Sequence, residues 1–193
     1  MTHSLFPAVL AATLSATLLA APAHAQTDAL PFEVIIPDFT EDREAALEVA
    51  ATRNAWRETF ERQDVDGMME FYVPDNYSFD LMAAPEEDGL KLAFAGEEIW
   101  RQNWVTFFEM FEDDLRISFD DMTVYQSGDL ATVQFLTRVE GTTSTDQYID
   151  MWARETNVLR RIDGEWLLVH DHVSVPMDFA TGQAVTTLRP DAE

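Results

Sequence analysis

The sequence predicts one α+β domain in which helices come first and an antiparallel sheet follows. Two observations support this class. Apolar residues recur at helical spacing in the first half of the chain, where Ala45, Val49, Trp56 and Phe60 share one stripe. In the second half, four long segments rich in β-branched and aromatic residues are separated only by short turn sequences.

Sequences that break regular structure separate the expected elements. The helix expected after Gly96 is strongly aromatic on one face, because its large rings recur at spacings of three and four. Residues 83–95 are expected to form a loop that remodels the mouth of any pocket beside it. Helices are expected at residues 42–62, at residues 68–72 and after Gly96, and strands at residues 77–82, 115–125, 130–140, 148–161 and 165–175.

The chain begins with features of an export signal. Residues 5–21 are apolar, and Ala23-His24-Ala25 has the small-x-small pattern of a secretory cleavage site. The run is short for a membrane anchor, so a signal peptide and a periplasmic or secreted protein are expected. The absence of cysteine excludes disulfides and thiol chemistry. The expected parts are a signal peptide (1–25), an extended leader (26–41), one domain (42–178) and a C-terminal tail (179–193).

Charge and missing motifs exclude several classes of function. The formal net charge of −24 makes nucleic acid and anionic membranes unfavourable partners. The sequence has no phosphate-binding glycine loop, no dinucleotide fingerprint and no nucleophile elbow. We therefore expect no organic cofactor, and no membrane association once the signal peptide is removed.

Several local motifs accompany this order of elements. They are Asp64-Val65-Asp66-Gly67-Met68-Met69, Ser78-Phe79-Asp80, Phe94-Ala95-Gly96, Asp150-Met151-Trp152-Ala153-Arg154-Glu155-Thr156 and His170-Asp171-His172-Val173-Ser174-Val175-Pro176.

In these motifs the chain resembles the nuclear transport factor 2-like (NTF2-like) superfamily, and most closely its SnoaL-like and ketosteroid isomerase homologue branch. The resemblance covers residues 42–178 and implies a cystatin-like cone, in which a curved antiparallel sheet wraps around helices. It also implies a homodimer, because the open sheet face of such folds commonly pairs. The resemblance does not identify an activity, since this fold hosts isomerases, dehydratases, lyases and binding modules without chemistry.

The last strand carries the first group of candidate site residues. His170, His172 and Ser174 lie two residues apart, so they share one face, together with Trp166 and Leu168. If that face looks into the cone, either histidine can act as a general acid or base. Packing by hydrogen-bonded core histidines is the alternative. On the same alternation, Asp171 is expected to point outward.

The third long strand carries the second group. Asp150, Trp152 and Arg154 share one face, which we also expect to look into the cone. Arg154 could bind a substrate carboxylate or an enolate oxygen, or form an ion pair with Asp150 or Asp80. A metal site built from the two histidines and one of these aspartates is a weaker alternative, and no metal is expected.

Asp80 is the candidate proton-abstracting carboxylate. The resemblance places it near the position where ketosteroid isomerases hold their base, and an apolar surround would raise its pKa. A solvated aspartate or a partner for Arg154 is the alternative. Trp56, Tyr72 and Trp104 are expected to line the cavity, although aromatic stripes on helices are more often core packing.

Two functions therefore remain open. The first is a cofactor-independent acid–base enzyme of the isomerase, dehydratase or lyase type, acting on a small, partly apolar organic substrate. The second is a non-catalytic module for ligand binding or dimeric assembly. A base beside an apolar cavity distinguishes the first from the second.

Overall fold

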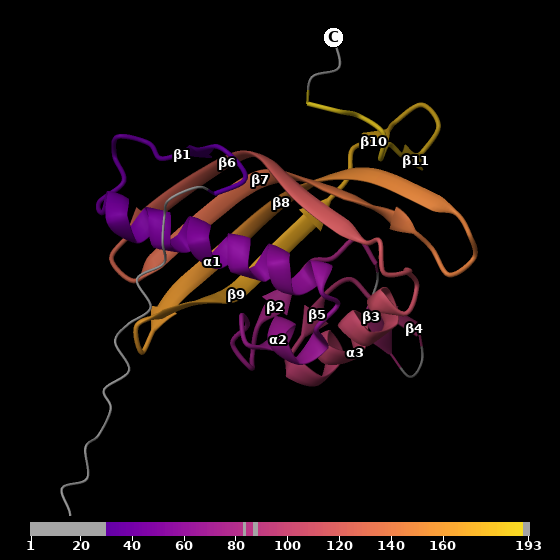
Figure 1. Ribbon diagram of the computed structural model, residues 1–193, viewed down its shortest axis with the longest axis horizontal. Helices are drawn as coiled ribbons and strands as arrows, with labels where there is room; N and C mark the ends of the chain where they lie inside the picture. The colour runs from indigo at the N-terminus through magenta and orange to yellow at the C-terminus, as the bar shows by residue number, and fades with distance from the viewer. Residues whose placement is uncertain (1–29, 83, 87–88, 191–193) are drawn as a thin grey trace, which may run out of the picture.

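The computed structural model describes residues 30–82, 84–86 and 89–190 of the 193-residue chain. A curved five-stranded sheet, ordered β1-β6-β7-β8-β9, wraps around the helices on its concave side (Figure 1). This is the α+β cone that the sequence predicts. The helices are α1 (Arg43–Glu61), α2 (Val65–Met69) and α3 (Glu97–Phe108), and the sheet strands are β1 (Val34–Ile35), β6 (Arg116–Ser127), β7 (Leu130–Thr142), β8 (Tyr148–Ile162) and β9 (Glu165–Ser174).

Three short ladders complete the described chain. The segment that was expected to be a loop contains one of them, a small hairpin that begins two residues after Met82. The ladders pair β2 (Tyr77–Ser78) with β5 (Phe94–Ala95), β3 (Ala84–Glu86) with β4 (Gly89–Lys91), and β10 (Met177–Asp178) with β11 (Gln183–Ala184).

Helix α1 starts and ends where its sequence dictates. The Asp42 side chain caps its first turn by accepting from the backbone N–H groups of Glu44 and Ala45, at 2.9 and 3.1 Å. Its apolar stripe, which includes Val49 and Trp56, is buried against the sheet. The predicted helix is confirmed to within one residue at each end.

The turn from β8 to β9 needs two residues in the left-handed region. Asp163 has a φ of 53° and Gly164 a φ of 93°, as in the two-residue hairpin turns that match strand twist. Ile162 and Glu165 pair across this turn. The dipeptide therefore fixes the register of the strand that follows.

A β-bulge then changes the register within β9. Leu159 pairs with Leu168, whereas the preceding residue of β8, Val158, pairs with His170. Val169 is thus an extra residue on β9, and side-chain alternation shifts by one beyond it. Leu168 points into the core, and so does Asp171 rather than His170.

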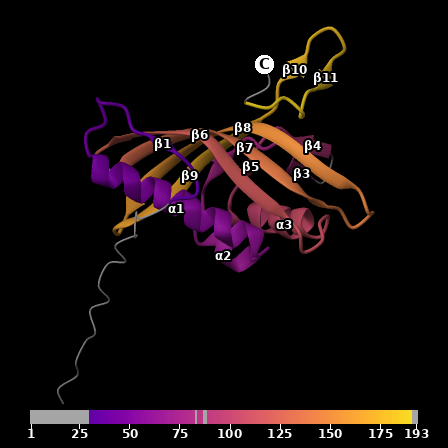
Figure 2. The same ribbon diagram turned by 45° about the horizontal axis from the view of Figure 1, so that its top comes forward.

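The C-terminal segment folds back over the convex side of the sheet (Figure 2). The N–H of Trp152 on β8 donates to the carbonyl of Thr186 at 2.8 Å, and Arg189 forms an ion pair with Asp150. The expected loose tail is therefore attached to β8 as far as it is described.

The core lies between the helices and the concave face of the sheet. Trp100, Leu115, Met122 and Leu159 are almost completely buried there. None of the described helices is long and apolar enough to cross a membrane. The expected signal peptide lies outside the described residues.

Candidate active site

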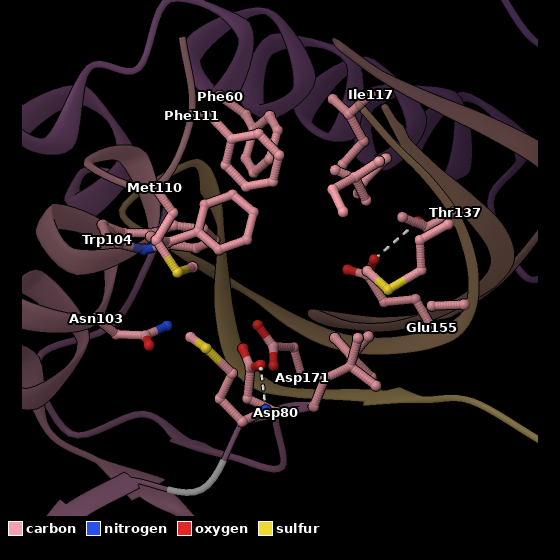
Figure 3. A pocket seen from close by; sticks show the side chains of 18 of the residues that line it. Phe60, Asp80, Asn103, Trp104, Met110, Phe111, Ile117, Thr137, Glu155 and Asp171 are labelled. Carbon is pink, nitrogen blue, oxygen red and sulfur yellow. Dashed lines mark hydrogen bonds between the residues drawn. The ribbon is translucent and has the colours of Figure 1, made fainter. Parts of the chain in front are cut away.

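A cavity of about 370 Å³ opens between the helices and the concave sheet face (Figure 3). Its size falls in the lower part of the range for pockets that bind small organic molecules. The aromatic side chains of Trp56, Phe60 and Trp104 form one wall, and Ile149 and Met151 of β8 lie across from them. The cavity suits a ligand that is mostly apolar.

Few polar side chains line this cavity, and several of them are carboxyls. Asp80 follows β2, Glu155 comes from β8 and Asp171 from β9. Figure 3 shows Asp80 and Asp171 next to each other, with Glu155 across from them. Thr137 and Asn103 supply neutral polar groups. An apolar cavity with a few convergent polar groups is the usual composition of a small-molecule site.

Asp80 reaches the cavity because its segment runs alongside β9. The Phe79 N–H donates to the carbonyl of Asp171 at 2.9 Å, and the Val173 N–H donates to the carbonyl of Phe79 at 2.8 Å. Alternation along this extended segment turns Ser78 and Asp80 inward and Phe79 outward. Burial raises the pKa of Asp80, and backbone N–H donors at Met82 and Leu81 oppose that effect only in part.

Asp171 is the more deeply buried of the two aspartates, with 5% of its surface exposed. Its Oδ2 accepts a long hydrogen bond of 3.5 Å from the Tyr72 hydroxyl, and within the described chain its Oδ1 has no donor. Burial raises the pKa of Asp171 well above its ordinary value, and the charges of Glu155 and Asp80 raise it further.

Tyr72 supports this pair from behind the cavity wall. Its hydroxyl accepts from Trp56 Nε1 at 3.2 Å, and its ring stacks on Trp100 with centroids 5.5 Å apart. Burial raises its pKa well above the ordinary value, so the hydroxyl keeps its proton. Tyr72 was expected to line the cavity, but it contacts Asp171 instead of the open space.

Glu155 is paired with the buried Arg53 of α1. Arg53 Nη2 lies 3.1 Å from Glu155 Oε1, and the exposed fraction is 1% for Arg53 and 6% for Glu155. The guanidinium also lies 4.2 Å from the centroid of the Trp56 ring. Arg53 is not among the residues that line the cavity, so this cation lies behind its wall and is not offered to a ligand.

The expectation that Asp150, Trp152 and Arg154 face the cone is wrong. They do share one face of β8, but it is the convex face. Alternation fixes which residues point together and leaves open which side they occupy. The apolar residues of the other set, Ile149 and Met151, would have identified it as the inner one.

The expectation that His170, His172 and Ser174 face the cone is also wrong, because none of them lines the cavity. The bulge at Val169 reverses the alternation that began at Trp166, so both histidines lie on the outside. The His170 ring contacts the Tyr77 carbonyl through Nδ1, and Phe79 packs edge-on against both imidazoles. Asp171, which was expected to point outward, is the residue that faces in.

Metal binding at these residues finds no support in the described part of the chain. No group of three or more His, Asp and Glu side chains is arranged there to hold an ion. Asp150 instead pairs with Arg138 and Arg189, which lower its pKa to about 2.

Sequence reasoning missed the buried network around Glu155. Arg53 on an apolar helix stripe was the available signal, because a buried arginine needs a carboxylate partner nearby. Of the predicted site residues, Asp80, Trp56 and Trp104 do line the cavity. The arrangement offers two carboxyls of raised pKa, one ion pair and an apolar space, which suits proton transfer without a metal or cofactor.

Comparison with known proteins agrees with this architecture. The family model of the SnoaL-like domain matches residues 49–178, more than half of the chain. An NTF2-like protein of unknown function from Pseudomonas putida KT2440 is 26% identical, with a TM-score of 0.67, covering 77% of this chain and 99% of its own. No curated protein sequence matches significantly.

Two more distant structures share the fold. A ketosteroid isomerase-like protein from Erwinia carotovora atroseptica SCRI1043 is 20% identical with a TM-score of 0.57, covering 69% of this chain and 97% of its own. The association domain of C. elegans CaMKII is 16% identical with a TM-score of 0.51, covering 66% of this chain and 92% of its own. At these identities the likeness concerns architecture alone.

Proposed function

The chain belongs to the family of SnoaL-like domains, and from this premise we propose that it is a cofactor-independent acid–base enzyme acting on a small, uncharged, largely apolar molecule. The reaction would be of the isomerase, dehydratase or lyase type. The observation that carries the proposal is the pair of carboxyls formed by the half-buried Asp80 and the buried Asp171, whose pKa values are raised beside an apolar cavity.

The two carboxyls would divide the work. Asp80 lies at the cavity and, when ionised, can accept a proton from a carbon next to a carbonyl group. Asp171 is buried more deeply and has the more strongly raised pKa, so it holds its proton and can donate a hydrogen bond to the enolate oxygen that forms.

The ligand is proposed to be uncharged because no arginine or lysine is among the described residues that line the cavity. Arg53 lies behind its wall, paired with Glu155 and stacked on Trp56. An added anion would meet carboxyls, apolar side chains and a few neutral polar groups, at a high cost in desolvation. Arg154, the expected anion-binding residue, lies on the convex face.

The direct test is exchange of deuterium from solvent into an uncharged bicyclic ketone such as 2-tetralone, followed by NMR. Wild-type protein should accelerate exchange at the carbon next to the carbonyl. Asp80→Asn should slow it by roughly 100-fold or more, which is the usual contribution of a general base. Asp75→Asn makes the same chemical change at an exposed position and should leave the rate unchanged. Equal rates for Asp80→Asn and wild type would refute the proposal.

A second copy of the chain is the proposed partner, on the convex face of the sheet. In a molecule of net charge −24, two adjacent rows of this face carry no carboxylate, which favours contact between like-charged copies. The rows are Tyr125, Thr132, Val158 and His170, and Thr123, Gln134, Thr156 and His172. An assembly module without chemistry would use the same face, and the fold shared with an association domain is compatible with it.

Light scattering on purified protein tests the dimer. Wild type should have twice the mass of one chain, and Arg154→Glu, which adds a carboxylate beside these rows, should shift it toward one. A wild-type protein that stays monomeric at about 100 μM would exclude this partner.

Export remains a proposal that rests on residues 1–25 of the sequence. Mass spectrometry of the protein recovered from a bacterial periplasm should give a mature chain that begins at Gln26. A chain that keeps its first 25 residues and stays with the cell interior would contradict it.

A further inference from the structure

Arg53 and Glu155 form the most deeply buried ion pair among the described residues, and the proposed proton transfer does not use it directly. Glu155 Oε1 accepts from Arg53 Nη2 at 3.1 Å and from Asn157 Nδ2 at 3.0 Å, and Oε2 accepts from the Thr137 hydroxyl at 2.9 Å. Three donors converge on this carboxylate, as a buried negative charge requires. Glu155 is therefore held in one place and is a poor candidate for a base.

Asp171 has the opposite surroundings. Its Oδ2 has only the long contact with the Tyr72 hydroxyl, and its Oδ1 is buried with no donor in the described chain. An ionised Asp171 would be an unsolvated charge facing other carboxylates, whereas a protonated Asp171 has an O–H to donate. The titratable and charged groups that act on it are Tyr72, Asp80, Glu155 and Arg53, and the neutral Ser78 hydroxyl lies beside it.

These two environments are complementary. The donors and the cation of this region gather on Glu155, so the negative charge is fixed there. Like charges in a shared low-dielectric site cannot both ionise easily, so the neighbouring carboxyl retains its proton. Arg53 and the Ser78 hydroxyl act against this, but they only partly offset it, and the charge of Arg53 is shared with Glu155.

We propose that Glu155 is a positioning residue that keeps Asp171 in its protonated, hydrogen-bond-donating form, with Arg53 as its anchor. The inference rests on the proposed acid–base function for its consequence in turnover. The protonation state of Asp171 itself can be measured without any substrate.

The experiment follows the side-chain carboxyl carbons of the aspartates by 13C NMR as pH is varied, in wild type and in Glu155→Gln. The amide keeps the size of the side chain and removes its charge. The titration midpoint of Asp171 should fall by about one pH unit or more, a tenfold change in its acid dissociation constant. Thr137→Val is the matched control, because it removes one hydrogen bond to Glu155 and leaves the charge in place.

Loss of Glu155 alone leaves Arg53 buried without a partner, so this variant could fail to fold. The double variant Arg53→Met/Glu155→Gln removes both charges and should show a smaller fall of the Asp171 midpoint in the same direction. An Asp171 midpoint that is unchanged in whichever of these variants folds overturns the proposal. A midpoint that falls just as far in Thr137→Val also overturns it, because packing rather than charge would then be responsible.

The outcome is independent of the proposed reaction. If no ketone exchanges deuterium but the Asp171 midpoint falls as described, the proposed function fails and the role of Glu155 stands. If wild type accelerates deuterium exchange but the Asp171 midpoint does not move in the Glu155 variants, the proposed function stands and the role of Glu155 fails. If both succeed, the exchange rate of Glu155→Gln should begin to decline at a lower pH than that of wild type, because Asp171 loses its proton there.

Discussion

At the scale of single residues, the candidate site depends on the carboxyls of Asp80 and Asp171. Their burial, partial for Asp80 and nearly complete for Asp171, costs stability. Removing a carboxylate from water without sufficient donors disfavours its charged form. For Asp171 the result is a raised pKa and an oxygen without a donor in the described chain. Proteins keep such costs where function needs them, which is why this pair is a better site candidate than the two histidines outside the cavity.

Asp171→Asn should stabilise the protein at alkaline pH. A carboxyl whose pKa is raised on folding contributes full stability below its unfolded pKa of about 3.9, and loses it as pH rises toward the folded pKa. The free energy of unfolding of wild type should therefore fall with rising pH in that range. The amide removes this dependence, and its gain should be about 1.4 kcal/mol for every tenfold decrease that folding causes in the acid dissociation constant of Asp171.

Urea unfolding at pH 4 and pH 8 measures both effects. The gain of Asp171→Asn over wild type should be larger at pH 8 than at pH 4. A variant that is equally destabilised at both pH values would mean that Asp171 accepts hydrogen bonds as a carboxylate, contrary to the geometry described.

At the scale of elements, most of the architecture could be predicted from the sequence. The apolar stripe of α1 and the Asp163-Gly164 turn act locally, so their patterns can be read along the chain. The inner and outer faces could not be assigned in the same way. The bulge at Val169 arises from how β8 pairs with β9, and the sequence of β9 alone does not indicate it.

The candidate site shows the consequence of that difference. Trp56 and Trp104 were predicted to line the cavity from their helix faces, and Asp80 was singled out by the family resemblance; all three do line it. Asp171 and Glu155 were missed because the inner and outer faces were assigned the wrong way round on both β8 and β9. Strand alternation amplifies a single misplaced residue into a wrong list of site residues.

Substitution of both histidines tests the assignment of His170 and His172 to the outer face of β9. His170→Gln/His172→Gln should exchange deuterium into the ketone at a rate within about threefold of wild type, because neither ring lines the cavity. Loss of exchange comparable to that of Asp80→Asn would return the histidines to the mechanism and require a different packing of β9.

The attachment of the C-terminal segment makes a second element-scale prediction. Asp150 holds it through Arg189, and its pKa of about 2 means that this link is present above the ordinary carboxyl range and is lost as pH falls toward 2. Asp150→Asn should speed hydrogen exchange at residues 177–190 and leave the core strands protected. Unchanged exchange in that segment would show that its backbone bonds to β8 are sufficient.

At the scale of the whole molecule, the two sides of the sheet differ in composition. The concave side encloses an apolar cavity with carboxyls whose acidity is shifted, and the convex side is free of carboxylates over two adjacent rows. In a chain of net charge −24 such a face is where a second copy meets least repulsion. Chemistry on one side and assembly on the other would leave both functions compatible.

The central claim is that the concave cavity, and not the face with the histidine pair, is the working site. The five tryptophans provide a direct test, since Trp56, Trp100 and Trp104 line the cavity whereas Trp152 lies on the convex face and Trp166 lies elsewhere in the core. The measurement is the 1H–15N NMR spectrum of the indole groups during titration with 2-tetralone. The account predicts shifts for the three cavity indoles and none for Trp152 and Trp166. Shifts confined to Trp152, or none at any indole up to the solubility of the ketone, would contradict it.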